Sequence, residues 1–336
     1  MKKMILAGAC ALASLPLLAS DLTPSPSPRV PRPAQVVNLR RADGARSRHT
    51  LDPNQNEGIN VDVIGRVNGG GGVLFKTSLD VSNNTTDSTR VDFFALLKDQ
   101  VNGHEFEIDG GIVNAGVAAA GGGQLAGISV AHFDDFIDAL RNAPGGLTAQ
   151  EESDGVLGSL VLQFYGFTPA FGKASAEARF YSSVPAGNGS LSGGTIGVSL
   201  NGHEFTDSEP TSLVGIVRNT VGEANTPQLY TNFFICNEGY VDSSGLVGQL
   251  VTLRLTGYSN STGAITGTFT YPSLSWGQTA VIGNVFSLLG GNPSKDDTLL
   301  VFVDIVSGNS AISGASAKND NITKDPSAAQ LRPANF

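Results

Sequence analysis

Three patterns occur twice along this chain, in the same order, and they constrain its fold more than any other feature. Thr77–Asn83 (TSLDVSN) matches Thr231–Asn237 (TNFFICN), and residues 160–182 align without gaps on residues 299–321. Between these two blocks stands a helical stripe of apolar residues with i, i+3, i+4, i+7 spacing. Its two copies are Phe133, Phe136, Ile137 and Leu140, and Ile282, Val285, Phe286 and Leu289. The ordered set predicts a tandem pair of homologous modules, each with one short amphipathic helix.

Most of the remaining sequence consists of short apolar or alternating runs bounded by Gly, Asn, Asp or Pro, which is typical of strands. Val61–Val67, Arg90–Leu97 and Leu299–Val306 are examples. Glycine supplies 42 of the 336 residues and charged residues only 15%, which excludes a coiled coil and a disordered acidic chain. The chain is therefore predicted to be all-β, with two tandem β-sandwich modules of the jelly-roll or immunoglobulin-like type.

The first twenty residues have the features of an export signal. Lys2 and Lys3 precede the apolar stretch Met4–Leu18, and small residues stand before Asp21. We therefore expect a signal peptide over 1–20 and a secreted, extracellular or cell-surface protein, with the periplasm as an alternative. Cys10 leaves open a lipoprotein alternative. No later segment reaches eighteen apolar residues, so no transmembrane helix is expected.

The expected boundaries follow from the duplication and from proline and charge. Residues 21–56 are rich in Pro and Arg and are predicted to be a flexible arm. Module 1 is placed at 57–205, including a Gly/Ala-rich stretch at 110–127 that is predicted to be a flexible loop. Module 2 is placed at 206–336. Residues 51–336 hold 13 basic and 28 acidic residues, a net charge of −15, which argues against nucleic acid as a partner.

We find no catalytic motif in the sequence. There is no Gly-x-Ser-x-Gly elbow, no phosphate-binding Gly-x-x-x-x-Gly-Lys loop and no zinc-protease helix signature. Removal of the signal peptide would leave Cys236 as the only cysteine, and its apolar neighbours predict a buried side chain rather than a reactive thiol. We therefore predict a protein that is not an enzyme. A secreted hydrolase stays as an alternative, because a carboxylate pair that meets only in the fold leaves no sequence motif.

Two of the four histidines stand in identical pentapeptides, Asn102–Phe106 and Asn201–Phe205, both NGHEF. One interpretation is a shared metal site, because two imidazoles and two carboxylates satisfy zinc or copper. The interpretation that we favour is structural, because Asn-Gly forms a type I′ hairpin turn and His-Glu-Phe then starts the returning strand.

Two further groups of residues are candidates for binding. Asp320, Asn321 and Asp325 place oxygen donors close together near the C-terminus and form a calcium candidate, although they fit no ordered calcium-loop pattern. No other cofactor is expected. Trp276, Tyr271 and Tyr258 are the candidates for stacking against sugar rings, which a carbohydrate-binding module would present on one exposed face.

Several motifs resemble those of a family of secreted bacterial proteins that carry tandem β-sandwich repeats and are largely of unassigned function. Residues 70–83 (GGGVLFKTSLDVSN) are similar to the opening of such a repeat, and Tyr230–Asn237 is similar to its Arg-Thr-Asn strand. Residues 303–321, with Asp325 and Pro326, resemble its closing hairpin. The chain departs from the family pattern at Lys76 and Tyr230, where arginine is expected. The resemblance implies a β-sandwich fold and export, and it transfers no catalytic residue.

Together these features predict an exported, non-enzymatic structural or adhesion protein of the extracellular space or cell surface. The expected partners are a cell-surface polymer or another extracellular protein. The alternative is a carbohydrate-binding module, with a glycan as its ligand.

Overall fold

The computed structural model describes residues 31–44, 48–49, 55–68, 73–114, 122–166, 173–183, 195–204, 210–219, 229–242, 245–296, 298–320 and 326–334. In this part the chain is predominantly β-strand with three short helices, which confirms the predicted all-β class. The predicted signal peptide and Cys10 lie outside the described residues. Within them, no helix is both long and apolar enough to cross a bilayer.

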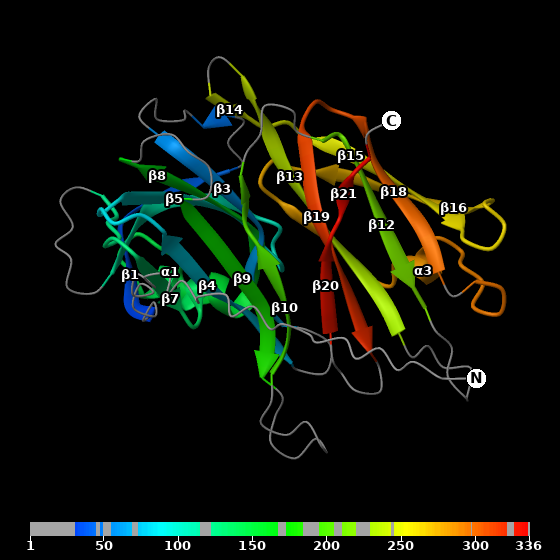
Figure 1. Cartoon of the computed structure of the whole chain (residues 1–336), viewed down its shortest axis with the longest axis horizontal. Coiled ribbons are helices and arrows are strands. Elements are labelled where there is room, and N and C mark those ends of the chain that lie inside the picture. Colours follow the sequence, from blue (N-terminus) through cyan, green and yellow to red (C-terminus); the bar gives the residue numbers. More distant parts are fainter. Residues whose placement is uncertain are drawn as a thin grey trace, which may run out of the picture.

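The strands form two groups that lie side by side (Figure 1). The first half contains a 10-stranded sheet in the order β10-β9-β4-β7-β1-β6-β5-β8-β3-β11. An additional pairing of β4 with β3 closes the central strands of this sheet into a barrel. The strands of the sheet are β1 (Pro31–Asp43), β3 (Gln55–Asn68), β4 (Leu74–Asn83), β5 (Arg90–Asp99), β6 (Glu105–Asn114), β7 (Ser129–Phe133), β8 (Val156–Tyr165), β9 (Ala174–Ser183), β10 (Thr195–Asn201) and β11 (His203–Glu204).

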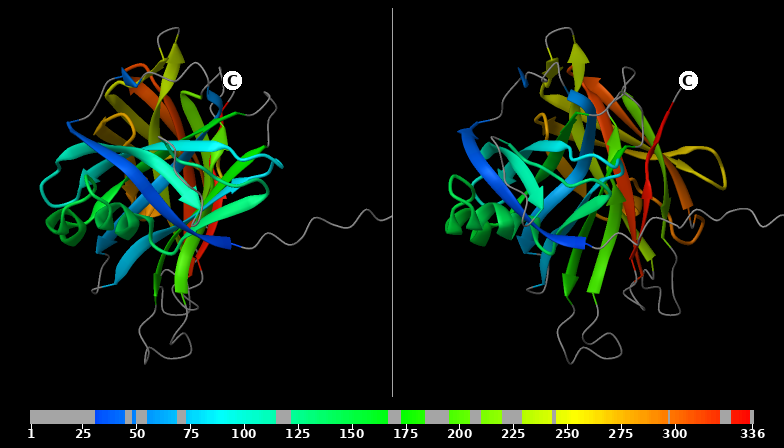
Figure 2. Two further views of the ribbon diagram at one scale, coloured as in Figure 1. Left: turned by 90° about the vertical axis from the view of Figure 1, so that its left-hand side faces the viewer. Right: turned by 60° about the vertical axis from the view of Figure 1, so that its left-hand side comes forward.

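The prediction of a flexible arm over 21–56 is wrong for β1. This strand pairs in parallel with β7 and antiparallel with β6, and Val36 is buried in the barrel core. Figure 2 shows β1, in blue, crossing the first half of the protein. Five prolines and six arginines in residues 21–50 suggested an extended arm, but proline at a strand start and charge on the solvent side are compatible with an inserted strand.

Arg41 fixes the end of β1 against the helices. Its guanidinium donates hydrogen bonds to both carboxylate oxygens of Glu151, at 2.8 and 2.5 Å, and its charge lies 4.3 Å from the Phe106 ring centroid. The hydrogen bond to Arg41 is the main reason that the pKa of Glu151 falls to about 2. A bidentate pair of this kind positions both partners, so β1 is docked along its length.

The prediction of a flexible loop over 110–127 is also wrong at both ends. Residues 110–114 belong to β6, and Leu125 is fully buried and pairs with Thr89. A Cβ at Gly123 would lie 1.8 Å from the Val91 carbonyl oxygen. Glycine at this position therefore allows two backbone segments to pack closely, and it does not make the segment flexible. Residues 115–121 lie outside the described part.

The second half is built from two sheets. One is 5-stranded in the order β16-β15-β18-β12-β21, and the other is 6-stranded and contains β2-β14-β13-β19-β20, with β17 paired to β13. Phe233, Leu255 and Ile312 from the two sheets meet in one buried core. The strands are β2 (Arg48–His49), β12 (Ser212–Arg218), β13 (Leu229–Asp242), β14 (Gly245–Val247), β15 (Val251–Ser259), β16 (Ile265–Leu274), β17 (Thr279–Ile282), β18 (Thr298–Ser307), β19 (Ala311–Asp320), β20 (Pro326–Gln330) and β21 (Arg332–Pro333).

Both predicted apolar stripes fall partly on short helices, but the first residue of each lies on a strand, Phe133 on β7 and Ile282 on β17. In α1 (Phe136–Asn142) the side chains of Phe136, Ile137 and Leu140 are fully buried, and α3 (Val285–Leu288) buries Val285 and Phe286. A further helix, α2 (Ala149–Asp154), was not predicted, so the expectation of one helix in each module fails in the first half. Its capping box, formed by Thr148 and Glu151, was the available sequence signal.

The two halves share a set of strand pairings. In the first half β3 pairs with β8, β8 with β5, β5 with β6, and β4 with both β9 and β7. In the second half β12 pairs with β18, β18 with β15, β15 with β16, and β13 with both β19 and β17. The strands that correspond occur in the same order along the chain.

Two buried polar side chains in each half also occupy corresponding places. The Thr77 hydroxyl accepts from the backbone N–H of Gly65 and donates to the carbonyl of the same residue, and Thr231 does the same with Arg218. Asn83 and Asn237 are both fully buried, and each donates to two backbone carbonyls. These side chains satisfy backbone groups where the strand ladders stop.

An apolar contact joins the halves. Val63, Phe180 and Leu200 of the first half pack against Phe234 and Ala315 of the second. A second apolar cluster contains Phe94, Leu96 and Val161 from the first half and Trp276 from the second. The two clusters bury outward-facing residues of the barrel, so the halves form one continuous body in Figure 1.

Candidate functional site

Trp276 is buried, so its predicted role in sugar stacking is wrong. Its side chain is 3% exposed, it packs 6.3 Å from the Phe94 ring, and its indole N–H donates to the Glu238 carbonyl. Gly248 makes room for the indole, because a Cβ there would lie 1.9 Å from the ring. This tryptophan joins the two halves and offers no face to a ligand.

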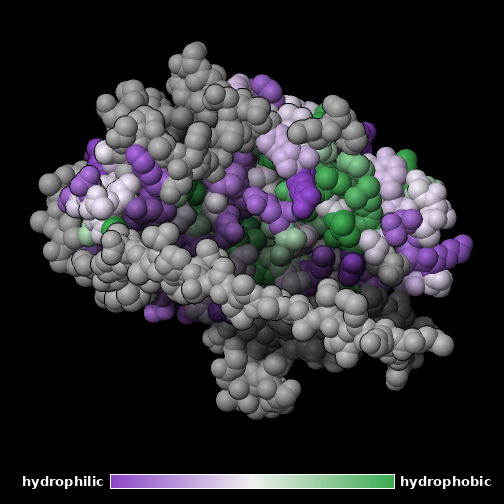
Figure 3. Space-filling view, viewed as in Figure 1, coloured by the Kyte–Doolittle hydropathy of each residue, from purple (hydrophilic) through white to green (hydrophobic). Residues whose placement is uncertain are grey.

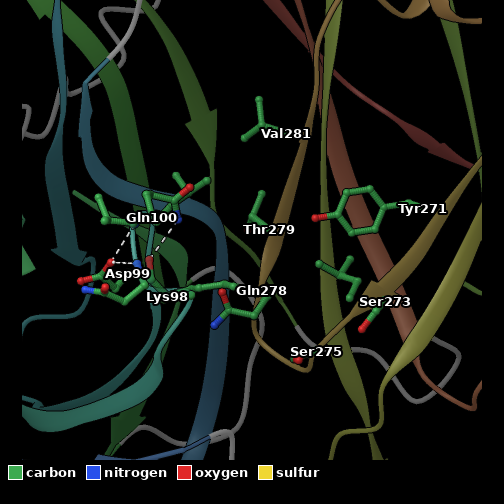
Figure 4. Close-up of a pocket in the computed structure, with 14 residues that line it drawn as sticks. Lys98, Asp99, Gln100, Tyr271, Ser273, Ser275, Gln278, Thr279 and Val281 are labelled. Carbon is green, nitrogen blue, oxygen red and sulfur yellow. Dashed lines mark hydrogen bonds between the residues drawn. The ribbon is translucent and has the colours of Figure 1, made fainter. Parts of the chain in front are cut away.

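Tyr271 lines a cleft of about 400 Å³ between the halves. In Figure 4 Lys98 and Gln100 lie on one side, Tyr271 lies on the other, and its hydroxyl points into the space between them. Thr279 and Gln278 lie between the two sides. The lining is largely polar, with one aromatic ring.

Tyr258 lies on the outer face of the 5-stranded sheet, in contact with Phe302 at a ring distance of 5.6 Å. The strand register places it in a row that crosses four strands, Ile265–Tyr258–Leu300–Ile216. We call these four residues the apolar row. Ile265, Leu300 and Ile216 are exposed, and Figure 3 shows hydrophobic side chains gathered over β12 on the face that it presents.

The apolar row ends at β16, which is the outermost strand of its sheet in the described part of the chain. β16 has ten residues and none is charged. Its register with β15 is regular from Gly267 to Tyr271. Natural edge strands are usually blunted by charge, by proline, by shortness or by bulges. β16 has Pro272 near its end and a register shift at each end of its pairing with β15, and its central residues carry none of these devices.

The calcium candidate lies outside the description of side chains. Asn321 and Asp325 are outside the described residues, and for Asp320 only the backbone, at the end of β19, is described. The calcium interpretation therefore stays a prediction.

The two NGHEF pentapeptides have different surroundings. The first pentapeptide does lie in a hairpin connection, between the end of β5 at Asp99 and the start of β6 at Glu105. The predicted type I′ turn is wrong, because Gly103 has a positive φ of 70° and Asn102 does not have a positive φ. In the second, the hairpin prediction is wrong. The chain leaves β10 at Asn201, and His203 then pairs with Asn60 of β3. The imidazole of His104 lies 3.8 Å from Asp43, whereas His203 is grouped with other carboxylates. The two histidines therefore do not form one shared metal site.

His203 instead meets two carboxylates at the junction of the halves. Its Nδ1 lies 3.6 Å from Asp62 Oδ1 on β3, and its Nε2 contacts Glu238 Oε1 on β13. One ligand atom from each of the three side chains lies within 4.8 Å of the others. We call Asp62, His203 and Glu238 the junction triad.

Electrostatics at the junction triad reflect its burial. Asp62 is 4% exposed and Glu238 3%. Burial raises the pKa of Asp62 to about 6; the facing His203 opposes this shift and the Glu238 charge adds to it. Burial also raises the pKa of the nearby Cys236 thiol well above its ordinary value, which agrees with the predicted inert cysteine.

Comparison of the chain with protein-family models, with curated proteins and with solved structures finds no match. The chain is thus placed by its own geometry as an all-β protein with two packed halves. Sequence reasoning singled out His203, but it missed Asp62 and Glu238, which stand in unremarkable strand segments far apart along the chain.

Proposed function

We propose that the protein is an exported, non-enzymatic structural or adhesion protein of the cell surface, which assembles with further copies of itself through the second half. One observation carries the proposal: β16 is a ten-residue, uncharged edge strand, and it stands beside the exposed apolar row. The export signal in the sequence supports the location.

The occupant of this edge is a second copy of the chain. An open edge presents unpaired backbone N–H and C=O groups to any strand that can pair with them. A two-fold axis beside β16 would pair it with the β16 of a partner and would bring the apolar rows of both copies into one surface. Ile265, at 60% exposed, would lose contact with water in such a dimer.

We also propose that the two halves descend from one duplicated unit, as in the tandem-repeat family that the sequence resembles. The shared strand pairings and the corresponding hydrogen bonds of Thr77 and Thr231 support this origin. Duplication would explain why β16 is open, because its counterpart β6 pairs with β1 and the second half has no described strand in that place.

The assembly is tested by light scattering on the chain during size-exclusion chromatography over a range of concentrations. We expect a dimer or larger species, and we expect Ile265→Lys and Thr268→Lys to raise its dissociation constant at least about tenfold, because each buries a charge at the edge. Val101→Lys is the matched control, since Val101 is 68% exposed in the β5–β6 hairpin.

A wild-type chain that remains monomeric, or equal weakening by Val101→Lys, would contradict the assembly. Fractionation of the producing cells tests the location separately. Recovery of the chain in the cytoplasmic fraction alone would contradict the export proposal and would leave the assembly result standing.

A second candidate function, carbohydrate binding, is favoured by the cleft in Figure 4, where Tyr271 lies among polar side chains. An array of glycans incubated with the chain should then give a signal that falls at least about tenfold in Gln100→Ala and Tyr271→Ser. Tyr258→Ser, which alters an aromatic on another face, should leave the signal unchanged. Absence of any wild-type signal would remove this candidate.

A further inference from the structure

The junction triad brings together three kinds of metal-ligating side chain from strands of both halves. Asp62 comes from β3 and His203 from β11 in the first half, and Glu238 comes from β13 in the second. Their ligand atoms lie within 4.8 Å of one another. The three side chains are therefore close enough for one ion to contact an atom of each.

The two carboxylates of the junction triad are deeply buried. Asp62 and Glu238 are both more than nine-tenths buried. Carboxylates in a protein interior are stable when they are paired, hydrogen-bonded or bound to a metal ion. A buried pair of carboxylates beside an imidazole is therefore a suitable place for a divalent cation.

The carboxylates are held in place by neighbouring donors. Asn60 Nδ2 donates to Asp62 Oδ1 at 2.9 Å and to Glu238 Oε1 at 2.7 Å. Ser313 Oγ donates to Asp62 Oδ1 at 2.7 Å, and the Thr279 hydroxyl donates to the Asp62 carbonyl. Such outer hydrogen bonds orient ligand side chains in metal sites. They come from both halves, so the arrangement exists only when the halves are packed together.

We propose that Asp62, His203 and Glu238 form a site for a transition-metal dication, Zn²⁺ being the probe of choice, which ties the two halves of the chain together. One imidazole nitrogen and two carboxylate oxygens suit zinc. Calcium is disfavoured, because it takes six to eight oxygen ligands. This site is independent of the proposed assembly through β16.

The test is a titration of the full chain, first stripped with a chelator, with Zn²⁺ in a calorimeter. We expect one zinc ion for each chain. We also expect a rise in melting temperature of about 5 °C or more when free zinc exceeds the dissociation constant about a hundredfold. Co²⁺ in place of zinc should give the visible absorption of a low-coordinate site, which reports the ligands without any variant.

Matched variants locate the ion. His203→Asn and Glu238→Gln should each weaken zinc binding at least about a hundredfold, because each removes a ligand. His132→Asn is the control: His132 also lies between two carboxylates, Asp80 at 2.7 Å and Asp134 at 3.1 Å, but on the surface.

Two results would overturn the proposal. One is a wild-type chain that gives neither zinc heat nor a cobalt spectrum. The other is binding that survives His203→Asn and is lost in His132→Asn, which would assign the ion to the surface cluster. If Glu238→Gln does not fold, the wild-type titration and the two histidine variants still show whether zinc binds at the junction triad.

Discussion

Replacing Val36 with aspartate is expected to destabilise the first half by about 3 kcal/mol or more, because it places an unpaired charge in the barrel core. Val36 is buried on β1, between strands β6 and β7. If β1 were a flexible arm, the substitution would have almost no effect. The measurement is the midpoint of denaturant unfolding, followed by circular dichroism and by the fluorescence of Trp276.

Gln35→Asp is the control for this substitution, since Gln35 is the exposed neighbour on the same strand. It should change stability by no more than about 0.5 kcal/mol. Trp276 fluorescence is informative because this side chain packs against Phe94 of the first half. Equal midpoints for Val36→Asp and Gln35→Asp would show that β1 does not hold the barrel together.

Asn237→Ala and Asn83→Ala should each cost about 3 kcal/mol or more, because buried backbone groups lose their partners. Asn237 donates to the carbonyls of Gln249 and Leu274 and accepts from the Ser310 hydroxyl. Asn83 donates to the carbonyls of Asp87 and Ala126. Thermal unfolding of the two variants, compared with the wild type, measures the losses.

Asn68→Ala serves as the control for the asparagine pair, since Asn68 is exposed at the end of β3. Its effect should stay within about 0.5 kcal/mol. A large loss of stability in only one of the two variants would mean that Asn83 and Asn237 have different structural roles. That result would weaken the proposed common origin of the halves.

Local patterns in the sequence were sufficient for the fold class and for two helices. The stripes at Phe136 and Val285 predicted buried helical faces because a period of 3.6 residues is a property of the segment itself. Alternating runs such as Arg90–Leu97 predicted strands for the same reason. The buried Cys236 also followed from its apolar neighbours.

Features that depend on distant partners were not predicted. β1 is rich in proline and arginine, and only its pairing with β6 and β7 makes it a strand. The carbohydrate-binding alternative required an exposed Trp276, but this side chain is buried against Phe94 of the first half. The junction triad combines side chains that no local spacing connects, and its histidine was found only because the pentapeptide is repeated.

The position of β1 has a consequence for how the chain acquires its structure. Synthesis delivers β1 before β6 (Glu105–Asn114) and β7 (Ser129–Phe133), and β2 has to wait for β14 (Gly245–Val247). Contacts between such distant segments slow folding. The earliest described segment to leave the ribosome therefore has to wait for strands that are made later, and until then the nascent barrel has an open seam.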